Sequence, residues 1–244
     1  MKTLIVIPSR LSATRLPGKP LLKINGLSMI SHVFKKAEDA NIGEVYVATE
    51  DQEIIEDVKK NGGQAILTSK NHKTGTDRVY EAIKKIKKPD VELIINLQGD
   101  EPLMEVEDIQ NLYYQMTKTK FEFGTLASNI SNKDLYYKEN VVKVSTEDSL
   151  INSPFPEAIN FMRKIEKIDK NIYHHLGIYC YQFETLERFV LLNQSSNEMK
   201  YKLEQLRAID NHIKINVALA KASPIGVDTN EDFVAIKKIM EYKS

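Results

Sequence analysis

The sequence predicts an α/β protein built on a mostly parallel sheet with helices on both faces. Short apolar runs without alternation occur at residues 4–7, 45–48 and 93–97, as expected of strands buried on both sides. Segments with apolar residues at helical spacing lie between these runs. Strands and helices therefore alternate along the chain, which favours a parallel sheet wound with helices.

The first half of the chain consists of successive strand–helix units. The strand at 4–7 ends at Pro8, and a polar loop follows it. A helix is expected after the loop, because apolar residues from Met29 to Ala37 recur every three or four positions. The remaining expected elements are a strand at 45–48, a helix at 52–60, a strand at 65–67, a helix at 78–86 and a strand at 93–97.

The second half is less regular. Candidate strands lie at 124–129, 141–144 and 178–181, and a polar stretch at 147–171 separates the last two. We interpret roughly 130–190 as a small insertion that serves dimerisation. The spacing of Ser195 and Glu198 is that of a capping box, so a helix should begin there and run to about Asn211.

A strand at 213–219 and a helix from about Thr229 complete the expected order. No repeat, low-complexity tract or flexible linker divides the chain, so residues 1–244 are predicted to form a single domain.

Composition excludes several classes of function. Lys plus Arg and Asp plus Glu both number 34, so no net charge would attract nucleic acid or an anionic membrane. The single cysteine, Cys180, excludes an internal disulfide and a multi-cysteine zinc site. No apolar run approaches the length of a signal peptide or a membrane span. We therefore expect a cytoplasmic protein with small-molecule substrates.

The loop after the first strand carries Arg10, Arg15, Gly18 and Lys19, and two prolines stiffen it. Ligands of open α/β sheets bind at the carboxyl ends of the strands, where this loop lies. Guanidinium groups, an ammonium group and free backbone N–H groups suit a triphosphate. The alternative is a solvated surface loop. Neither a dinucleotide-binding glycine motif nor a P-loop is present, which counts against an oxidoreductase and a P-loop ATPase.

Two acidic residues are candidates for a metal site. Asp100 follows Gly99 at the end of the apolar run 93–97, and Asp228 precedes the last helix. Mg²⁺ prefers one or two carboxylates together with substrate phosphate oxygens. The alternatives are a turn at Asp100 and a helix cap by Asp228 or Thr229.

Nine segments resemble the 3-deoxy-manno-octulosonate cytidylyltransferase (CMP-Kdo synthetase) family, in the same order along the chain. They lie at residues 7–10, 15–21, 25–26, 47–49, 74–78, 98–102, 175–179, 203–207 and 226–229. Sialic acid CMP-synthetases share the general plan, but their phosphate loop carries Gly-Ser-Lys after the first arginine, which this chain lacks.

The resemblance implies a Rossmann-like nucleotide-diphospho-sugar transferase fold and a homodimer in which CTP and Kdo meet over Mg²⁺, for lipopolysaccharide biosynthesis. It implies that Arg10, Arg15 and Lys19 hold the triphosphate, and that Asp100 and Asp228 hold the metal. The segment near the cytosine contains Thr74, Gly75, Thr76 and Arg78. The residues that match the sugar-binding positions are Gln98, His175, Glu204 and Gln205.

The implied reaction is in-line attack of the anomeric hydroxyl of Kdo on the α-phosphorus of CTP, with pyrophosphate leaving. Lys19, Arg15, Asp100 and Asp228 are the expected catalytic residues, acting by positioning and charge neutralisation. Three alternatives remain: CMP transfer to a related acid sugar such as 8-amino-Kdo or a sialic acid, a nucleotide-sugar-dependent glycosyltransferase, and a non-catalytic nucleotide sensor.

The chain departs from the family in one region. Family members carry a sugar-binding arginine shortly after the strand that matches 141–144, whereas residues 149–156 contain none. His174 and Cys180 also replace an expected basic residue and an expected glycine. Arg163 and Lys164 are the nearest cations, and we expect one of them to reach the sugar.

Overall fold

The computed structural model describes residues 1–12, 15–165, 170–224 and 226–242. The chain divides into two compact units, the first formed by residues 1–109 and 224–244 and the second by residues 110–223. Within the described ranges, every helix is too short or too polar to span a lipid bilayer.

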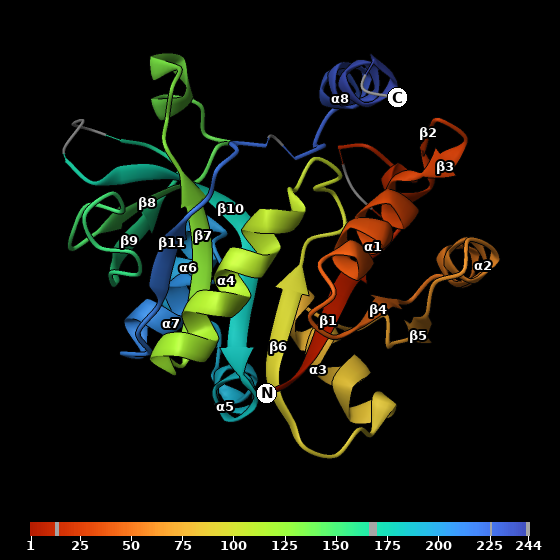
Figure 1. The fold of residues 1–244 in the computed structure, drawn as a ribbon, viewed down its shortest axis with the longest axis horizontal. Helices are drawn as coiled ribbons and strands as arrows, with labels where there is room; N and C mark the ends of the chain where they lie inside the picture. Colours follow the sequence, from red (N-terminus) through yellow and green to blue (C-terminus); the bar gives the residue numbers. More distant parts are fainter. Residues whose placement is uncertain (13–14, 166–169, 225, 243–244) are drawn as a thin grey trace. The chain divides into compact units, whose positions relative to one another are not determined.

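Unit 1 is built on a parallel sheet of four strands. Their order is β6 (Val91–Leu97), β1 (Lys2–Ser9), β4 (Glu44–Thr49) and β5 (Ala65–Leu67), as Figure 1 shows. Leu4, Ile5 and Ile7 of β1 are at most 1% exposed, which accounts for the continuous apolar run in the sequence. The α/β class and the parallel sheet predicted from the sequence are confirmed here.

Three amphipathic helices pack on this sheet: α1 (Met29–Asp39), α2 (Gln52–Lys60) and α3 (Gly75–Ile86). The hydroxyl of Ser28 caps α1 by accepting a hydrogen bond from the Ser31 N–H. Thr74 and Asp77 form a capping box, so α3 begins at Gly75 and not at residue 78 as predicted.

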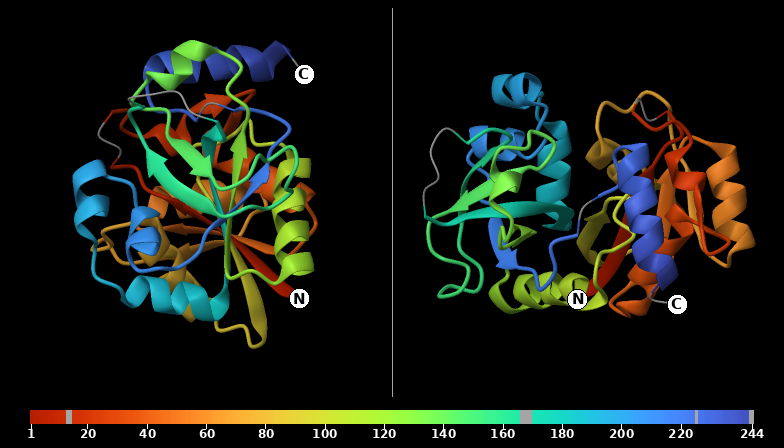
Figure 2. Two further views of the ribbon diagram at one scale, coloured as in Figure 1. Left: turned by 90° about the vertical axis from the view of Figure 1, so that its left-hand side faces the viewer. Right: turned by 90° about the horizontal axis from the view of Figure 1, so that it is seen from above.

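The C-terminal helix α8 (Asn230–Tyr242) belongs to unit 1 and lies beside the N-terminal hairpin of β2 (Lys23–Ile24) and β3 (Leu27–Ser28), as Figure 2 shows. Ile24, Met29, Val227 and Ile236 form a buried cluster between these segments. This packing holds residues 226–228 against the N-terminal loop of the unit.

Unit 2 contains a mixed sheet. The long strand β10 (Ile172–Gln182) pairs antiparallel with β7 (Phe123–Ser128) and β8 (Lys143–Thr146). On either side, β9 (Ala158–Met162) pairs antiparallel with β8, and β11 (Asn216–Leu219) pairs parallel with β7.

Two strand predictions in this unit were wrong in extent, and one strand was missed. The expected strand at 178–181 is the end of the 11-residue β10. The first part of β10 was missed because His174 and His175 are polar, although they are only 8% and 7% exposed. The polar stretch at 147–171 contains β9, and the expected strand at 213–219 begins only at Asn216.

The predicted helix at 195–211 is two helices, α6 (Ser196–Tyr201) and α7 (Leu206–Asp210). The expected capping box at Ser195 is present, but Lys202 adopts a left-handed conformation with φ 54° and ends α6. Helices α4 (Val106–Thr119) and α5 (Phe183–Leu191) were not predicted. Two short 3₁₀ turns also lie among the described residues, η1 (Lys19–Leu21) in unit 1 and η2 (Lys133–Tyr136) in unit 2.

A buried ion pair joins α6 and α7. The guanidinium of Arg207 donates two hydrogen bonds to the Glu198 carboxylate, at 2.8 Å from Nε and 2.6 Å from an Nη. The side chains are only 2% and 4% exposed, and the guanidinium lies 4.8 Å from the centre of the Phe189 ring. The pair therefore fixes the turn at 202–205 that separates the two helices.

Replacing Arg207 with Leu should lower the free energy of unfolding by about 3 to 5 kcal/mol, because Glu198 loses its buried partner. Urea unfolding followed by circular dichroism measures this change. The matched control is Lys214→Leu, which removes a cation that is 75% exposed and pairs with Glu157. The control should cost less than about 1 kcal/mol, and equal losses in the two variants would contradict the expectation.

Candidate active site

A cavity of about 360 Å³ opens in unit 1 where the carboxyl ends of β1 and β6 meet. The predicted residues that line it are Arg10, Arg15, Lys19, Thr74, Gly75, Arg78, Gln98, Asp100 and Asp228. Ser9, His72 and Lys73 also line it and were not predicted. Residues from four distant segments of the chain therefore converge on one site, as the positions of the strand ends require.

The N-terminal loop is fixed by backbone hydrogen bonds. The Leu11 N–H donates to the Asp51 carboxylate at 2.7 Å, which ties the loop to the end of β4. The Gly18 N–H donates to the Leu11 carbonyl at 3.1 Å and closes the loop. Gly18 has φ 71°, a conformation that favours glycine, and it turns the chain so that η1 starts at Lys19. Residues 13–14 lie outside the described ranges.

Lys19 lies at the centre of the charged side chains. Its ammonium group donates to Asp100 Oδ2 at 2.7 Å and to the Val227 carbonyl at 2.6 Å, and it lies 3.9 Å from Asp228 Oδ1. The guanidinium of Arg15 binds Asp228 at 2.9 Å. Lys19 and Arg15, which were predicted to bind phosphate, thus neutralise the two carboxylates that were predicted to bind the metal. Contacts of 2.7 to 3.9 Å join the four groups into one cluster.

The backbone explains why Asp100 reaches this cluster. A Cβ on Gly99 would lie only 3.2 Å from the Pro8 carbonyl oxygen and 3.0 Å from the Ile30 side chain, so the close approach of β6 to β1 favours glycine. The Val227 N–H donates to the Asp100 carbonyl at 2.9 Å. This hydrogen bond brings the segment before α8, and with it Asp228, beside the end of β6.

Of the two residues that the sequence offers as a helix cap, Thr229 is confirmed in this role and Asp228 is not. The Asp232 carboxylate accepts hydrogen bonds from the N–H groups of Asp228 and Thr229, and the Thr229 hydroxyl accepts from the Asp232 N–H. The start of α8 is therefore capped by Thr229 and Asp232. The Asp228 carboxylate points instead to Arg15.

The donor set at this site fits Mg²⁺. Two half-exposed carboxylates lie close enough to share one cation, and Mg²⁺ completes its coordination with water and substrate phosphates. Among the described residues, no group of three or more His, Cys, Asp or Glu side chains could hold a metal ion without such a substrate. Asp100 and Asp228 are the residues that would hold the ion together with a nucleotide.

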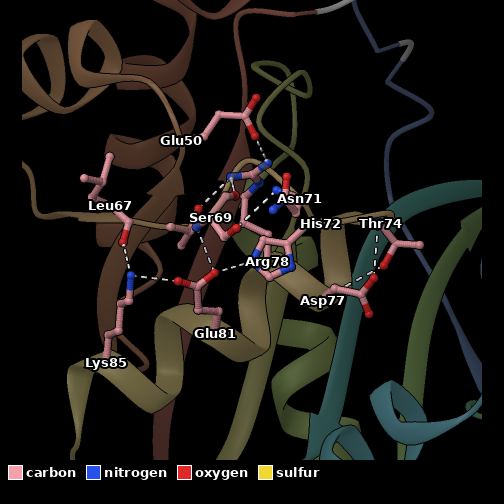
Figure 3. A network of polar contacts seen from close by, with 11 residues as sticks. Glu50, Leu67, Ser69, Asn71, His72, Thr74, Asp77, Arg78, Glu81 and Lys85 are labelled. Carbon is pink, nitrogen blue, oxygen red and sulfur yellow. Dashed lines mark hydrogen bonds and ion pairs between the residues drawn. The ribbon is translucent and has the colours of Figure 1, made fainter.

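Not every residue of the predicted cytosine segment presents its side chain to the cavity. The Arg78 guanidinium donates to the Glu50 carboxylate, to the Thr68 hydroxyl at 2.6 Å and to the Ser69 carbonyl at 3.2 Å, as Figure 3 shows. The Thr76 hydroxyl is buried and accepts from the amide of Asn96 at 3.3 Å. Thr76 is therefore absent from the cavity lining and supports the segment from inside. Arg78 lines the cavity together with Thr74 and Gly75, but its guanidinium is held by these partners.

His72 is a cavity residue that the sequence interpretation missed. Its Nε2 is hydrogen-bonded to the Glu81 carboxylate, which also accepts from Lys85 at 2.7 Å and from the Ser69 N–H at 2.9 Å, as Figure 3 shows. Burial by itself raises the pKa of the Glu81 carboxyl. The donors from Lys85, Ser69 and His72 outweigh burial and lower this pKa to about 2.

The predicted sugar-binding residues fall in both units. Gln98 lines the cavity of unit 1, whereas His175, Glu204 and Gln205 belong to unit 2. Within unit 2, the rings of His175 and Tyr179 are 5.5 Å apart, and the Tyr179 hydroxyl donates to the Gln205 side chain at 3.3 Å. Burial, with His174 beside it, lowers the pKa of His175 to about 3, so its imidazole is neutral at physiological pH.

Comparison with known proteins identifies the family of this chain. The profile of the cytidylyltransferase family matches residues 4–215. A 3-deoxy-manno-octulosonate cytidylyltransferase from Rhodopseudomonas palustris (strain BisB18) is 40% identical over 248 residues, covering 99% of this chain and 98% of the relative. One from Thermodesulfovibrio yellowstonii is 40% identical over 251 residues and covers 98% of each chain.

This chain belongs to the 3-deoxy-manno-octulosonate cytidylyltransferase family. A solved CMP:2-keto-3-deoxy-manno-octonic acid synthetase in complex with CTP has a TM-score of 0.89 and 34% identity, with 100% of both chains covered. A UDP-glucose pyrophosphorylase, with a TM-score of 0.72 and 13% identity over 100% of this chain and 99% of its own, shares the fold. The family and the nucleotidyltransferase class predicted from the sequence are confirmed.

The cations expected to replace the missing family arginine have structural contacts instead. Arg163 donates from all three of its nitrogens to backbone carbonyls, those of Glu139 and Lys202 at 3.1 Å and Tyr201 at 3.0 Å. Lys164 pairs with the Glu139 carboxylate on the surface at 2.8 Å. The expectation that one of them is a dedicated sugar-binding cation is not supported by these contacts.

A third cation of this region is buried. Lys143 is 0% exposed and donates to the carbonyls of Lys138 at 2.9 Å, Val141 at 2.8 Å and Arg163. Burial and the neighbouring Arg163 lower the pKa of Lys143 to about 8. With Arg163, it ties the loop at 138–141 to β9 and to the end of α6.

Both residues that replace family residues on β10 are also buried. His174 Nδ1 is hydrogen-bonded to the Ser223 hydroxyl at 2.9 Å, and burial, with Lys143 nearby, lowers its pKa to about 4. Cys180 is 0% exposed, and burial raises the pKa of its thiol. Neither side chain supplies a positive charge at neutral pH.

Replacing Glu81 with Gln should lower the free energy of unfolding by about 1 to 2 kcal/mol at pH 7, an amount reduced by partial solvent screening. Because the folded pKa of about 2 lies below the ordinary 4.5, this contribution is complete above pH 4.5 and is lost as the pH falls toward 2. Urea unfolding of parent and variant across this range measures the difference. Glu38→Gln, at an exposed site of α1, should show no such pH-dependent loss, and a constant difference for Glu81→Gln down to the lowest pH would contradict the assignment.

Proposed function

We propose that this protein transfers CMP from CTP to 3-deoxy-D-manno-octulosonate (Kdo), giving CMP-Kdo and pyrophosphate, in the cytoplasm and for lipopolysaccharide biosynthesis. The observation that carries the proposal is the cluster of Lys19, Arg15, Asp100 and Asp228 in a cavity at the ends of parallel strands. Whole-length similarity to relatives that bear this enzyme's name supports the choice of substrates.

In the proposed reaction, the anomeric oxygen of Kdo forms a bond to the α-phosphorus of CTP, and the bond from that phosphorus to the bridging oxygen of the β-phosphate breaks. The hydroxyl proton leaves to solvent and pyrophosphate departs. Arg10, Arg15 and Lys19 orient the triphosphate and neutralise the charge that develops on the leaving group. Bound Mg²⁺ supplies further neutralisation of the phosphate oxygens. Asp100 and Asp228 would hold the ion, and Lys19 and Arg15 would then bind phosphate in place of these carboxylates.

The residues proposed to bind the sugar are Gln98, His175, Glu204 and Gln205. We also propose that the protein works as a homodimer and that residues 130–190 contribute to the contact between subunits. Sedimentation of the purified protein would measure this oligomeric state directly.

A modified acid sugar is the second candidate substrate. Residues 149–156 contain no arginine, and the guanidinium of Arg163 is occupied by backbone carbonyls, so neither supplies the free guanidinium that other family members use. A guanidinium–carboxylate contact is worth roughly 1 to 3 kcal/mol, which is large enough to affect the choice of sugar.

Pyrophosphate release should therefore be compared for Kdo, 8-amino-Kdo and a sialic acid, with CTP and Mg²⁺ present. We expect the highest kcat/KM with Kdo and the lowest with the sialic acid. A higher kcat/KM with 8-amino-Kdo would shift the assignment to the modified sugar. No release with any of the three would reject the proposed reaction.

Asp100→Asn and Asp228→Asn should each lower the turnover rate by roughly 100-fold or more, because the metal loses a carboxylate without a loss of volume. Calorimetric titration with Mg²⁺ in the presence of CTP should show weakened metal binding in both variants. Asp39→Asn, which changes an exposed carboxylate of α1, is the control and should retain parental values. Normal Mg²⁺-dependent turnover in both site variants would exclude the proposed metal ligands.

A further inference from the structure

The pairing of β10, which carries His175, with β7 contains an irregularity close to the His175 imidazole. Pairing of β10 with β7 shifts register between Leu176 and Tyr179, so that Gly177 and Ile178 form a bulge. The bulge removes the Ile178 carbonyl from the regular ladder. This carbonyl accepts a hydrogen bond from the Thr125 hydroxyl of β7 at 2.6 Å.

The same hydroxyl lies 3.0 Å from His175 Nε2. Thr125 is opposite Tyr179 in the pairing, and Ala127, two residues further on, is opposite His175. Since side chains two residues apart on a strand point to the same face, Thr125, Tyr179 and His175 share one face of the sheet. Thr125 is 0% exposed, so water does not compete for its hydrogen bonds.

The two distances decide where the protons lie. An oxygen–oxygen separation of 2.6 Å requires a proton between the atoms, and a carbonyl has none to give. The hydroxyl proton of Thr125 is therefore donated to the Ile178 carbonyl, and the hydroxyl oxygen can only accept a hydrogen bond from the imidazole. Because the imidazole is neutral, a proton on Nε2 leaves Nδ1 as a lone-pair acceptor.

We propose that Thr125 is a positioning residue that fixes His175 as its Nε2–H tautomer, so that Nδ1 accepts a hydrogen bond from a hydroxyl of the acid sugar. The assignment of His175 to the sugar rests on the proposed function. A neutral ring with its lone pair toward the substrate repels a carboxylate, whose oxygens are also acceptors. His175 thus recognises a hydroxyl group, and the sugar carboxylate is bound elsewhere.

The packing of the ring supports a fixed orientation. The Phe161 ring meets His175 edge to face, with centroids 5.1 Å apart and planes at 86°, and the Tyr179 ring lies 5.5 Å away. The low pKa of His175, about 3, follows from its burial and keeps the ring neutral throughout the working range of pH. Orientation, charge state and proton position are therefore all set before substrate arrives.

The direct test is ¹⁵N NMR of the free full-length protein labelled at histidine, with His175 assigned by comparison with His175→Gln. We expect the Nε2–H tautomer for His175 in the parent and in Thr125→Ser, which keeps the hydroxyl. Thr125→Val, which removes it at nearly the same volume, should show a mixture of tautomers. A predominant Nδ1–H form in the parent would overturn the proposal, and this measurement does not depend on whether the Val variant folds.

Steady-state kinetics provide the second readout. Thr125→Val should raise the KM for Kdo by about threefold to tenfold, the effect of one neutral hydrogen bond, and leave the KM for CTP unchanged. Thr125→Ser should restore the parental KM. Unchanged KM for Kdo in a folded Thr125→Val protein, or an equal rise for both substrates, would contradict the assigned role.

A pair of substitutions at His175 tests which ring nitrogen serves the sugar. The amide of Asn overlaps the position of Nδ1, whereas that of Gln overlaps Nε2. His175→Asn should therefore raise the KM for Kdo less than His175→Gln, and the reverse order or equal effects would count against Nδ1. An Nε2–H spectrum in a parent protein that shows no turnover with Kdo would reject the proposed substrate while supporting the Thr125 assignment.

Discussion

The ammonium group of Lys19 is the contact on which the arrangement of the unit 1 site depends. Asp100 and Asp228 come from the end of β6 and the start of α8, and two carboxylates this close repel each other without a cation. Lys19 satisfies the Val227 carbonyl at the same time, so one side chain fixes both the charge and the backbone. Because Asp100 and Asp228 are 33% and 29% exposed, the ion pairs can be exchanged for a nucleotide and a metal without a large desolvation cost.

In unit 2, by contrast, several polar side chains are buried and not exchangeable. Lys143, His174, His175, Glu198 and Arg207 are all at most 8% exposed, and each has hydrogen-bonding partners within the unit. Buried polar groups of this kind are costly to rearrange, because every change of partner leaves a group unsatisfied. The exchangeable charges of unit 1 suit an incoming polyanion, and the fixed polar groups of unit 2 suit a stereochemically specific ligand.

The sequence predicted unit 1 well because its apolar runs follow the periods of buried strands and amphipathic helices. It failed in unit 2 where buried side chains are polar, as at Lys143 and His174, since a periodicity argument counts such residues as exposed. Helix α4 could have been found, because Ile109, Leu112 and Met116 are spaced at three and four residues and are all 0% exposed. The break at Lys202 could not, because only the buried pair of Glu198 and Arg207 shows why two short helices are preferred to one.

In the candidate site, too, some residues could be predicted from the sequence and others could not. Arg15 and Lys19 follow β1 and Asp100 follows β6, so the convergence of these three residues was predictable from the strand ends. Asp228 precedes α8, and its place in the site was implied by the family resemblance. His72 stands in a polar loop without any pattern, and its place in the cavity follows only from the fold. The contacts that occupy Arg78 and Arg163 were likewise hidden, because Glu50 and the carbonyls at 139, 201 and 202 are distant in sequence.

The burial of Cys180 has a practical consequence for following this protein in solution. The only thiol of the chain is 0% exposed and remains protonated, and a protonated thiol reacts poorly with alkylating dyes. A cysteine introduced at any exposed position would then be the single labelling site, with no need to remove the natural one. Two such positions, one in each unit, would carry a donor and an acceptor fluorophore, and their energy transfer would measure whether nucleotide changes the distance between the labels.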